Sequence, residues 1–141
     1  MTEPQNTPLQ PMPDDWRRAL AVVAHPDDLE YGCSAAIAAC TDGGRSVGHR
    51  PELVITMNHR DTWGGVRRVA VAGFAGPTHA EDATPGLERG VRSLLEHRTY
   101  IEALTDEDPE TYARELLTKW ATITGERFGG KPAVSFGLFA R

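Results

Sequence analysis

The chain has 141 residues, of which 40% are hydrophobic and 25% charged, and its formal net charge at pH 7 is -5. These values predict one globular domain that buries about 70% of its extended surface. The acidic balance argues against the basic footprint that binds nucleic acid or anionic lipid. No apolar run approaches the roughly 18 residues of a membrane-spanning helix, so we expect no membrane span.

The first 15 residues are rich in proline and contain no apolar stretch of the kind found in secretory signals. This composition predicts a disordered leader over 1–15 and a single α/β domain over 16–141. Without a secretory signal, the expected location is cytoplasmic.

Hydrophobic periodicity and turn residues predict strands at 18–24, 52–57, 67–72 and 133–138, and helices at 29–42, 86–104 and 110–124. Strands separated by helices indicate an α/β fold with βαβ units. In the third helix, large apolar residues recur near the helical period and are expected to face the core. These residues are Tyr112, Leu116, Leu117, Trp120 and Ile123.

The turn after the first predicted strand concentrates chemically active side chains. His25, Asp27 and Asp28 lie within four positions, interrupted only by Pro26. An imidazole and two carboxylates can supply two ligands to a divalent metal and leave one carboxylate for proton transfer. The alternative is plain helix capping, for which proline and aspartate are common residues. In open α/β sheets, sites gather beyond the carboxyl ends of strands, where this turn lies.

A second polar loop, which includes His59, follows the strand predicted at 52–57. If this strand is parallel to the first one, both loops open on the same edge of the sheet. His59 is then the best candidate for a third metal ligand or an oxyanion donor, and a simple polar turn is the alternative. His49, His79 and His97 are weaker candidates.

Cys33 and Cys40 are seven residues apart in the helix predicted at 29–42. Two helical turns separate them by roughly 10 Å, which is too far for a disulfide within the helix. We expect both to be reduced and to pack as small apolar residues. A zinc site on these thiols is disfavoured because neither belongs to a Cys-x-x-Cys pair.

The segment 24–32 reads Ala-His-Pro-Asp-Asp-Leu-Glu-Tyr-Gly and closely resembles the signature of the PIG-L/LmbE-like zinc-dependent N-deacetylases. Segments 50–56, 58–65 and 69–102 also resemble later parts of that family, the last including the pair His97-Arg98. The resemblance implies a Rossmann-like three-layer sandwich with a mainly parallel sheet. It further implies Zn²⁺ or another divalent metal held by His25 and Asp28, with Asp27 as the general base.

The chain departs from the family in one important feature. The family completes its metal site with the histidine of a later Asp-His pair, and no Asp-His dipeptide occurs in this chain. The resemblance therefore implies two internal deletions, near Gly65-Val66 and near 46–49, that arise from degeneration or from a faulty gene model. A parallel sheet that has lost a strand exposes edges, so we expect marginal stability or self-association.

The function implied by the resemblance is hydrolysis of the N-acetyl group of a small amino sugar conjugate, such as a glucosaminide of inositol or malate. Loss of the third ligand should impair this activity, because catalytic zinc normally has three protein ligands. The first alternative is a non-catalytic metal- or sugar-binding remnant of the same fold. A nucleotide-binding module is less favoured, since the chain lacks a glycine-rich phosphate loop.

Overall fold

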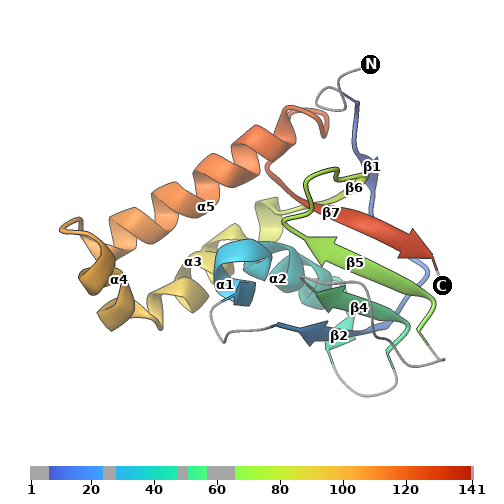
Figure 1. The fold of residues 1–141 in the computed structure, drawn as a ribbon, viewed down its shortest axis with the longest axis horizontal. Helices are drawn as coiled ribbons and strands as arrows, with labels where there is room; N and C mark the ends of the chain where they lie inside the picture. The colour runs from blue at the N-terminus through green and yellow to red at the C-terminus, as the bar shows by residue number, and fades with distance from the viewer. Residues whose placement is uncertain (1–6, 24–27, 48–50, 57–65, 141) are drawn as a thin grey trace.

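The computed structural model describes residues 7–23, 28–47, 51–56 and 66–140. Its strands are β1 (Gln10–Pro11), β2 (Arg18–Val22), β3 (Ser46–Val47), β4 (Leu53–Thr56), β5 (Arg68–Ala72), β6 (His79–Asp82) and β7 (Ala133–Ala140). The helices are α1 (Asp28–Gly32), α2 (Ser34–Asp42), α3 (Leu87–Leu95), α4 (Arg98–Leu104) and α5 (Pro109–Gly125), with a 3-10 turn, η2 (Thr84–Gly86). Figure 1 shows these helices grouped beside the sheet.

All the described strands form one sheet in the order β1-β6-β7-β5-β4-β2-β3. Four of its described strand pairs are parallel, and the two antiparallel pairs both involve β7. The predicted α/β fold with a mainly parallel sheet is therefore confirmed. In register, Val22 pairs with Thr56 and Thr56 with Val71, so β2, β4 and β5 all end at the same edge.

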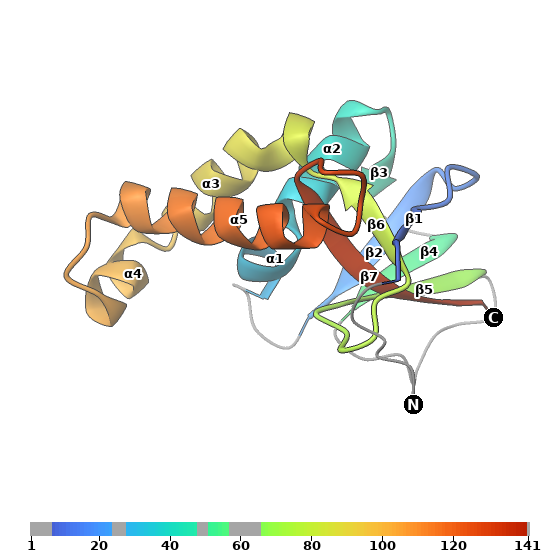
Figure 2. The same ribbon diagram turned by 90° about the horizontal axis from the view of Figure 1, so that it is seen from above.

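The two faces of the sheet follow from alternation along the strands. One face packs on α2 in a core of ten buried residues: Trp16, Ala19, Cys33, Ala36, Cys40, Leu53, Ile55, Ala70, Ala72 and Phe136. The opposite face carries a second apolar cluster that includes Val54, Val69 and Val71. Figure 2 shows the described helices on one side of the sheet. The described part of the chain thus has two layers, and the three-layer sandwich stays a prediction.

Glycines let α3 approach α2 closely. A Cβ atom at Gly86 would overlap the carbonyl oxygen of Ala35, and one at Gly90 would lie 2.9 Å from Ser34 Oγ. A side chain at either position would push the two helices apart. The close approach at these two glycines holds α2, together with α1 before it, against α3.

Two predicted helices are interrupted. The helix expected at 29–42 divides into α1 and α2 at Cys33, whose φ of -149° leaves the helical region. The helix expected at 86–104 divides into α3 and α4, with His97 at the junction and outside both helices. Hydrophobic periodicity continues through such breaks because the residues on either side still face the same core, so the sequence pattern did not reveal them.

The core face of α5 differs from the prediction. Its buried residues are Pro109, Ala113, Leu117, Ala121 and Gly125, and all five recur at every fourth position. Trp120 is 57% exposed and Ile123 45% exposed, although both were expected in the core. Small residues on the buried face allow α5 to lie close to the elements packed against it. The larger side chains, such as Trp120 and Ile123, then lie outside this interface.

The segment assigned to a leader, 1–15, is described from residue 7 onward. Leu9 is 6% exposed, and Gln10–Pro11 pairs with β6 as the parallel strand β1. Asp15 accepts two hydrogen bonds from the Arg68 guanidinium, at 2.6 and 3.0 Å. These are tertiary contacts, so a proline-rich composition gave no sign of them. Within the described residues, none of the helices is long and apolar enough to cross a membrane.

Candidate functional site

The candidate site is at the edge of the sheet where β2, β4 and β5 end. β2 ends at Val22, and its parallel neighbour β4 ends in register at Thr56. α1 begins at the half-buried Asp28, six positions beyond Val22. This strand-to-helix connection at a carboxyl edge is the kind of position at which open α/β sheets place their sites.

The described residues include only one of the four predicted site residues, Asp28. His25, Asp27 and His59 lie outside the described residues, as does the weaker candidate His49. Asp28 occupies the first turn of α1, where a carboxylate also suits the positive end of the helix. Both the ligand and the capping interpretations of Asp28 therefore remain predictions.

His79, another weaker candidate, is far from this connection. It begins β6, which is separated from β2 by β7, β5 and β4. Four strand spacings of about 4.8 Å place the two strands about 19 Å apart. Burial and then the charge of Arg68 lower the pKa of His79, and its Nδ1 lies 2.9 Å from Thr78 Oγ1. His79 therefore lies towards the opposite edge of the sheet, away from the connection between β2 and α1.

His97, in contrast, lies beside α1. Its Nε2 is 3.9 Å from Glu30 Oε2, and Ser93 Oγ donates a hydrogen bond of 3.3 Å to Glu30 Oε1. The side chains of Glu30 and His97 are 19% and 29% exposed. This Glu30 cluster, formed by Glu30, Ser93 and His97, joins the helix that begins at Asp28 to α3 and to the start of α4.

The Glu30 cluster was not predicted from the sequence. Glu30 belongs to the motif segment, but nothing in the spacing of Ser93 and His97 links them to it. Within the described residues, Glu30 Oε2 is buried and has no hydrogen-bond partner. A buried carboxylate oxygen in this state is a strong acceptor for a cationic or N–H donor, and His97 is the nearest candidate.

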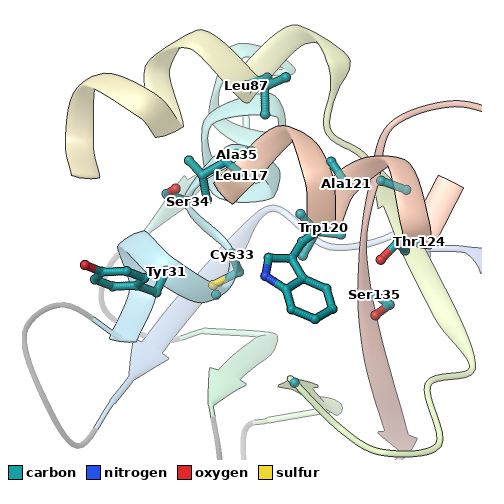
Figure 3. A pocket seen from close by; sticks show the side chains of 14 residues that line it. Tyr31, Cys33, Ser34, Ala35, Leu87, Leu117, Trp120, Ala121, Thr124 and Ser135 are labelled. Carbon is teal, nitrogen blue, oxygen red and sulfur yellow. The ribbon is translucent and has the colours of Figure 1, made fainter. Parts of the chain in front are cut away.

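A cavity of about 240 Å³ opens between the α1–α2 junction, α5, and the ends of β5 and β7. Figure 3 shows Tyr31 and Trp120 on either side of Cys33, with Thr124 and Ser135 on the far side of Trp120. The described residues that line this cavity include no Asp, Glu, Lys, Arg or His. Burial, then the charge of Glu30, raises the pKa of Cys33 to about 12, so its thiol is neutral.

The cysteines otherwise behave as predicted. Both are free and buried. Cys40, whose pKa burial also raises to about 12, packs in the core against the sheet. A thiolate metal site is therefore disfavoured, because a metal ligand must lose its proton.

The described residues alone do not assemble a metal site. No group of three or more His, Cys, Asp and Glu side chains in the described ranges could hold a metal ion. A scan of the chain against protein-family models finds no match, and a search of curated proteins finds none either. The case for a metal therefore rests on the motif in the sequence and on the place of Asp28 at the start of the helix that follows β2.

Proposed function

We propose that the chain is a zinc-dependent N-deacetylase of the PIG-L/LmbE type, with impaired activity toward the N-acetyl group of a small amino sugar conjugate. The observation that carries the proposal is the position of Asp28. It begins the first helix after β2, six positions beyond the last residue of that strand, and the parallel strands β4 and β5 end in register with β2. The family's three-layer sandwich and a cytoplasmic location belong to the same proposal.

The donor types in the motif suit the proposed metal. Zinc binds imidazole nitrogen and carboxylate oxygen, which His25 and Asp28 would supply. When bound, zinc polarises an acetamide carbonyl and makes water more acidic. Asp27 would take a proton from the attacking water and pass it to the leaving amine. His59 would serve as a third ligand or would donate a hydrogen bond to the developing oxyanion.

A specific observation favours a second candidate, a metal- or sugar-binding remnant without turnover. The chain has no Asp-His dipeptide, and its described residues contain no group of three potential ligands. Two ligands hold zinc less tightly than three, and a weakly held metal supports little hydrolysis. The remnant and the deacetylase differ in turnover and not in fold.

Zinc content and turnover, measured on the same preparations, test both candidates. The purified chain is loaded with zinc, dialysed and analysed for metal beside Asp28→Ala, with the exposed Asp106→Ala as the matched control. The proposal expects stoichiometric zinc in the parent and in Asp106→Ala, and its loss in Asp28→Ala. Equal zinc in all three proteins would contradict the ligand assignment.

Release of free amine from N-acetylglucosamine conjugates then separates the candidates. Slow release that Asp27→Asn abolishes, with zinc content unchanged, supports the deacetylase. Zinc binding without any release supports the remnant. Release at the same rate in Asp27→Asn would overturn the proposed role of Asp27.

A further inference from the structure

The cavity beneath Trp120 exists because small residues line it. Gly32, Ala35, Gly73, Ala121 and Ala133 contribute little side-chain volume, and the last two lie on α5 and β7 respectively. The cavity has a volume of about 240 Å³ and opens to the surface, so a small molecule could enter it.

Trp120 is placed as a wall of this cavity. It is 57% exposed, although Leu117 and Ala121 of the same helix are buried, and its indole extends across the cavity in Figure 3. A tryptophan that leaves one ring face open to a cavity offers a flat, polarisable surface for another ring. Ile123 is similarly exposed on the same helix but does not line the cavity.

The chemistry of the remaining lining defines the ligand. Leu87, Leu117 and Val134 give apolar contacts, whereas Ser34, Thr124 and Ser135 bring hydroxyl groups. Among the described residues of the lining, none is acidic, basic or histidine, and the Cys33 thiol keeps its proton at neutral pH. Burying a charged group in such a site costs free energy that none of these described side chains offsets with an opposite charge.

We propose that this cavity, between the α1–α2 junction, α5 and β7, binds an uncharged aromatic ring that carries a neutral hydrogen-bonding substituent. The ring stacks on Trp120, and the substituent reaches the hydroxyls of Thr124 and Ser135. The size agrees, since apolar cavities of about 150 Å³ accept benzene. The extra volume here accommodates a short substituent. The proposal concerns binding alone and does not depend on the proposed hydrolysis.

Three small probes test the proposal by ligand-observed NMR and calorimetry. Benzyl alcohol has the neutral ring, benzoate has a similar ring with a charge, and 1-propanol has the hydroxyl without a ring. We expect saturation transfer to the ring protons of benzyl alcohol and an affinity for benzoate weaker by about tenfold or more. 1-Propanol should show no measurable binding. Equal binding of all three, or no binding of benzyl alcohol, would overturn the proposal.

Variants then locate the bound probe. Trp120→Ala should abolish binding of benzyl alcohol, while Ile123→Ala, on the same helix and outside the cavity, should keep it. Ser135→Leu fills the cavity and leaves Trp120 intact, so it should also abolish binding, and circular dichroism verifies that each variant is folded. Unchanged binding in both Trp120→Ala and Ser135→Leu would refute the assignment.

The test is separable from the proposed function. Binding is measured in the presence of a chelator and repeated with Asp28→Ala, and the inference expects the same affinity under both conditions. Loss of benzyl alcohol binding in the chelator would show that the ring binds through the metal and not in this cavity.

Discussion

Glu30 of α1 and His97, at the junction of α3 and α4, form a carboxylate–imidazole pair, with 3.9 Å between Glu30 Oε2 and His97 Nε2. The pair connects residues 67 positions apart in the sequence, and Ser93 supports it from α3. Because Glu30 is two residues from Asp28, the pair and the serine hold the start of α1 against the helical layer.

The first prediction concerns this pair. His97→Ala removes the imidazole whose Nε2 lies 3.9 Å from the buried Glu30 Oε2, and losing the partner of a buried polar group costs about 1–3 kcal/mol. His97→Ala should therefore lower the free energy of unfolding in urea by an amount in that range. Glu30→Gln should make the same His97 substitution less costly, because the charge that needed a partner is gone. Additive effects of the two substitutions would mean that the pair is not coupled.

The second prediction concerns the contact between α2 and α3. Gly86→Ala places a methyl group where the carbonyl oxygen of Ala35 lies, so the helices must separate. Overpacking of this kind costs about 1–3 kcal/mol and occasionally more, which is a large part of the stability of a small domain. Gly76→Ala is the matched control, since its new Cβ would meet only ordinary contacts at 3.5 Å or more. A Tm for Gly86→Ala equal to that of Gly76→Ala would contradict the close packing.

The third prediction concerns the pH dependence of stability. Burial raises the pKa of Glu81 on β6 above its ordinary value of 4.5, although the nearby Arg45 partly opposes the shift. The folded protein therefore holds more protons than the unfolded chain from about pH 4.5 up to the raised pKa, and its stability falls as the pH rises through that window. Above the window, the destabilisation by ionised Glu81 is complete.

Glu81→Gln removes this destabilisation. The variant should have a higher Tm than the parent at pH 7, and the difference should shrink toward pH 4. Glu115→Gln, an identical change at an exposed position of α5, controls for the loss of one negative charge. A Tm difference for Glu81→Gln that does not change with pH would show that ionisation of Glu81 is not its cause.

The sequence predicted most of the fold because its main elements depend on local patterns. β4 and β5 are short apolar runs. α5 is preceded by Asp108, whose side chain accepts a hydrogen bond from the Thr111 N–H as a standard N-cap does. β1, β3 and β6 were not predicted. Two of them have only two residues, and β6 (His-Ala-Glu-Asp) is mostly polar, so their pairing depends on neighbours distant in sequence.

The candidate site was less predictable for the same physical reason. The motif residues stand together in the sequence, but the Glu30 cluster and the Trp120 cavity are made by tertiary contacts. His97 joins Glu30 only because the chain leaves the helical conformation between α3 and α4. Trp120 is exposed only because Ala121 and Gly125 bring α5 close to its neighbours. Periodicity indicates that a helix has an apolar face. It does not indicate which of two adjacent rows of residues on that helix will be buried.

The last prediction concerns self-association, which the sequence suggested would occur through exposed sheet edges. Within the described residues, the sheet ends on β1 and β3, each only two residues long, and short edge strands discourage pairing with another chain. The face of the sheet opposite the helices is a better candidate for association, because two apolar side chains are exposed on it: Leu20 is 39% and Val22 49% exposed. We therefore expect a concentration-dependent dimer in light scattering that buries this face.

Leu20→Ser combined with Val22→Thr should shift the chain to monomer at the same concentration, because the apolar area that drives association is reduced. Both side chains point away from the helical core, so the fold should be retained and the melt should stay cooperative. Tyr100→Ser, which changes an exposed aromatic residue on α4, is the control and should leave the dimer unchanged. A monodisperse monomer of the parent chain at all concentrations would reject association through this face.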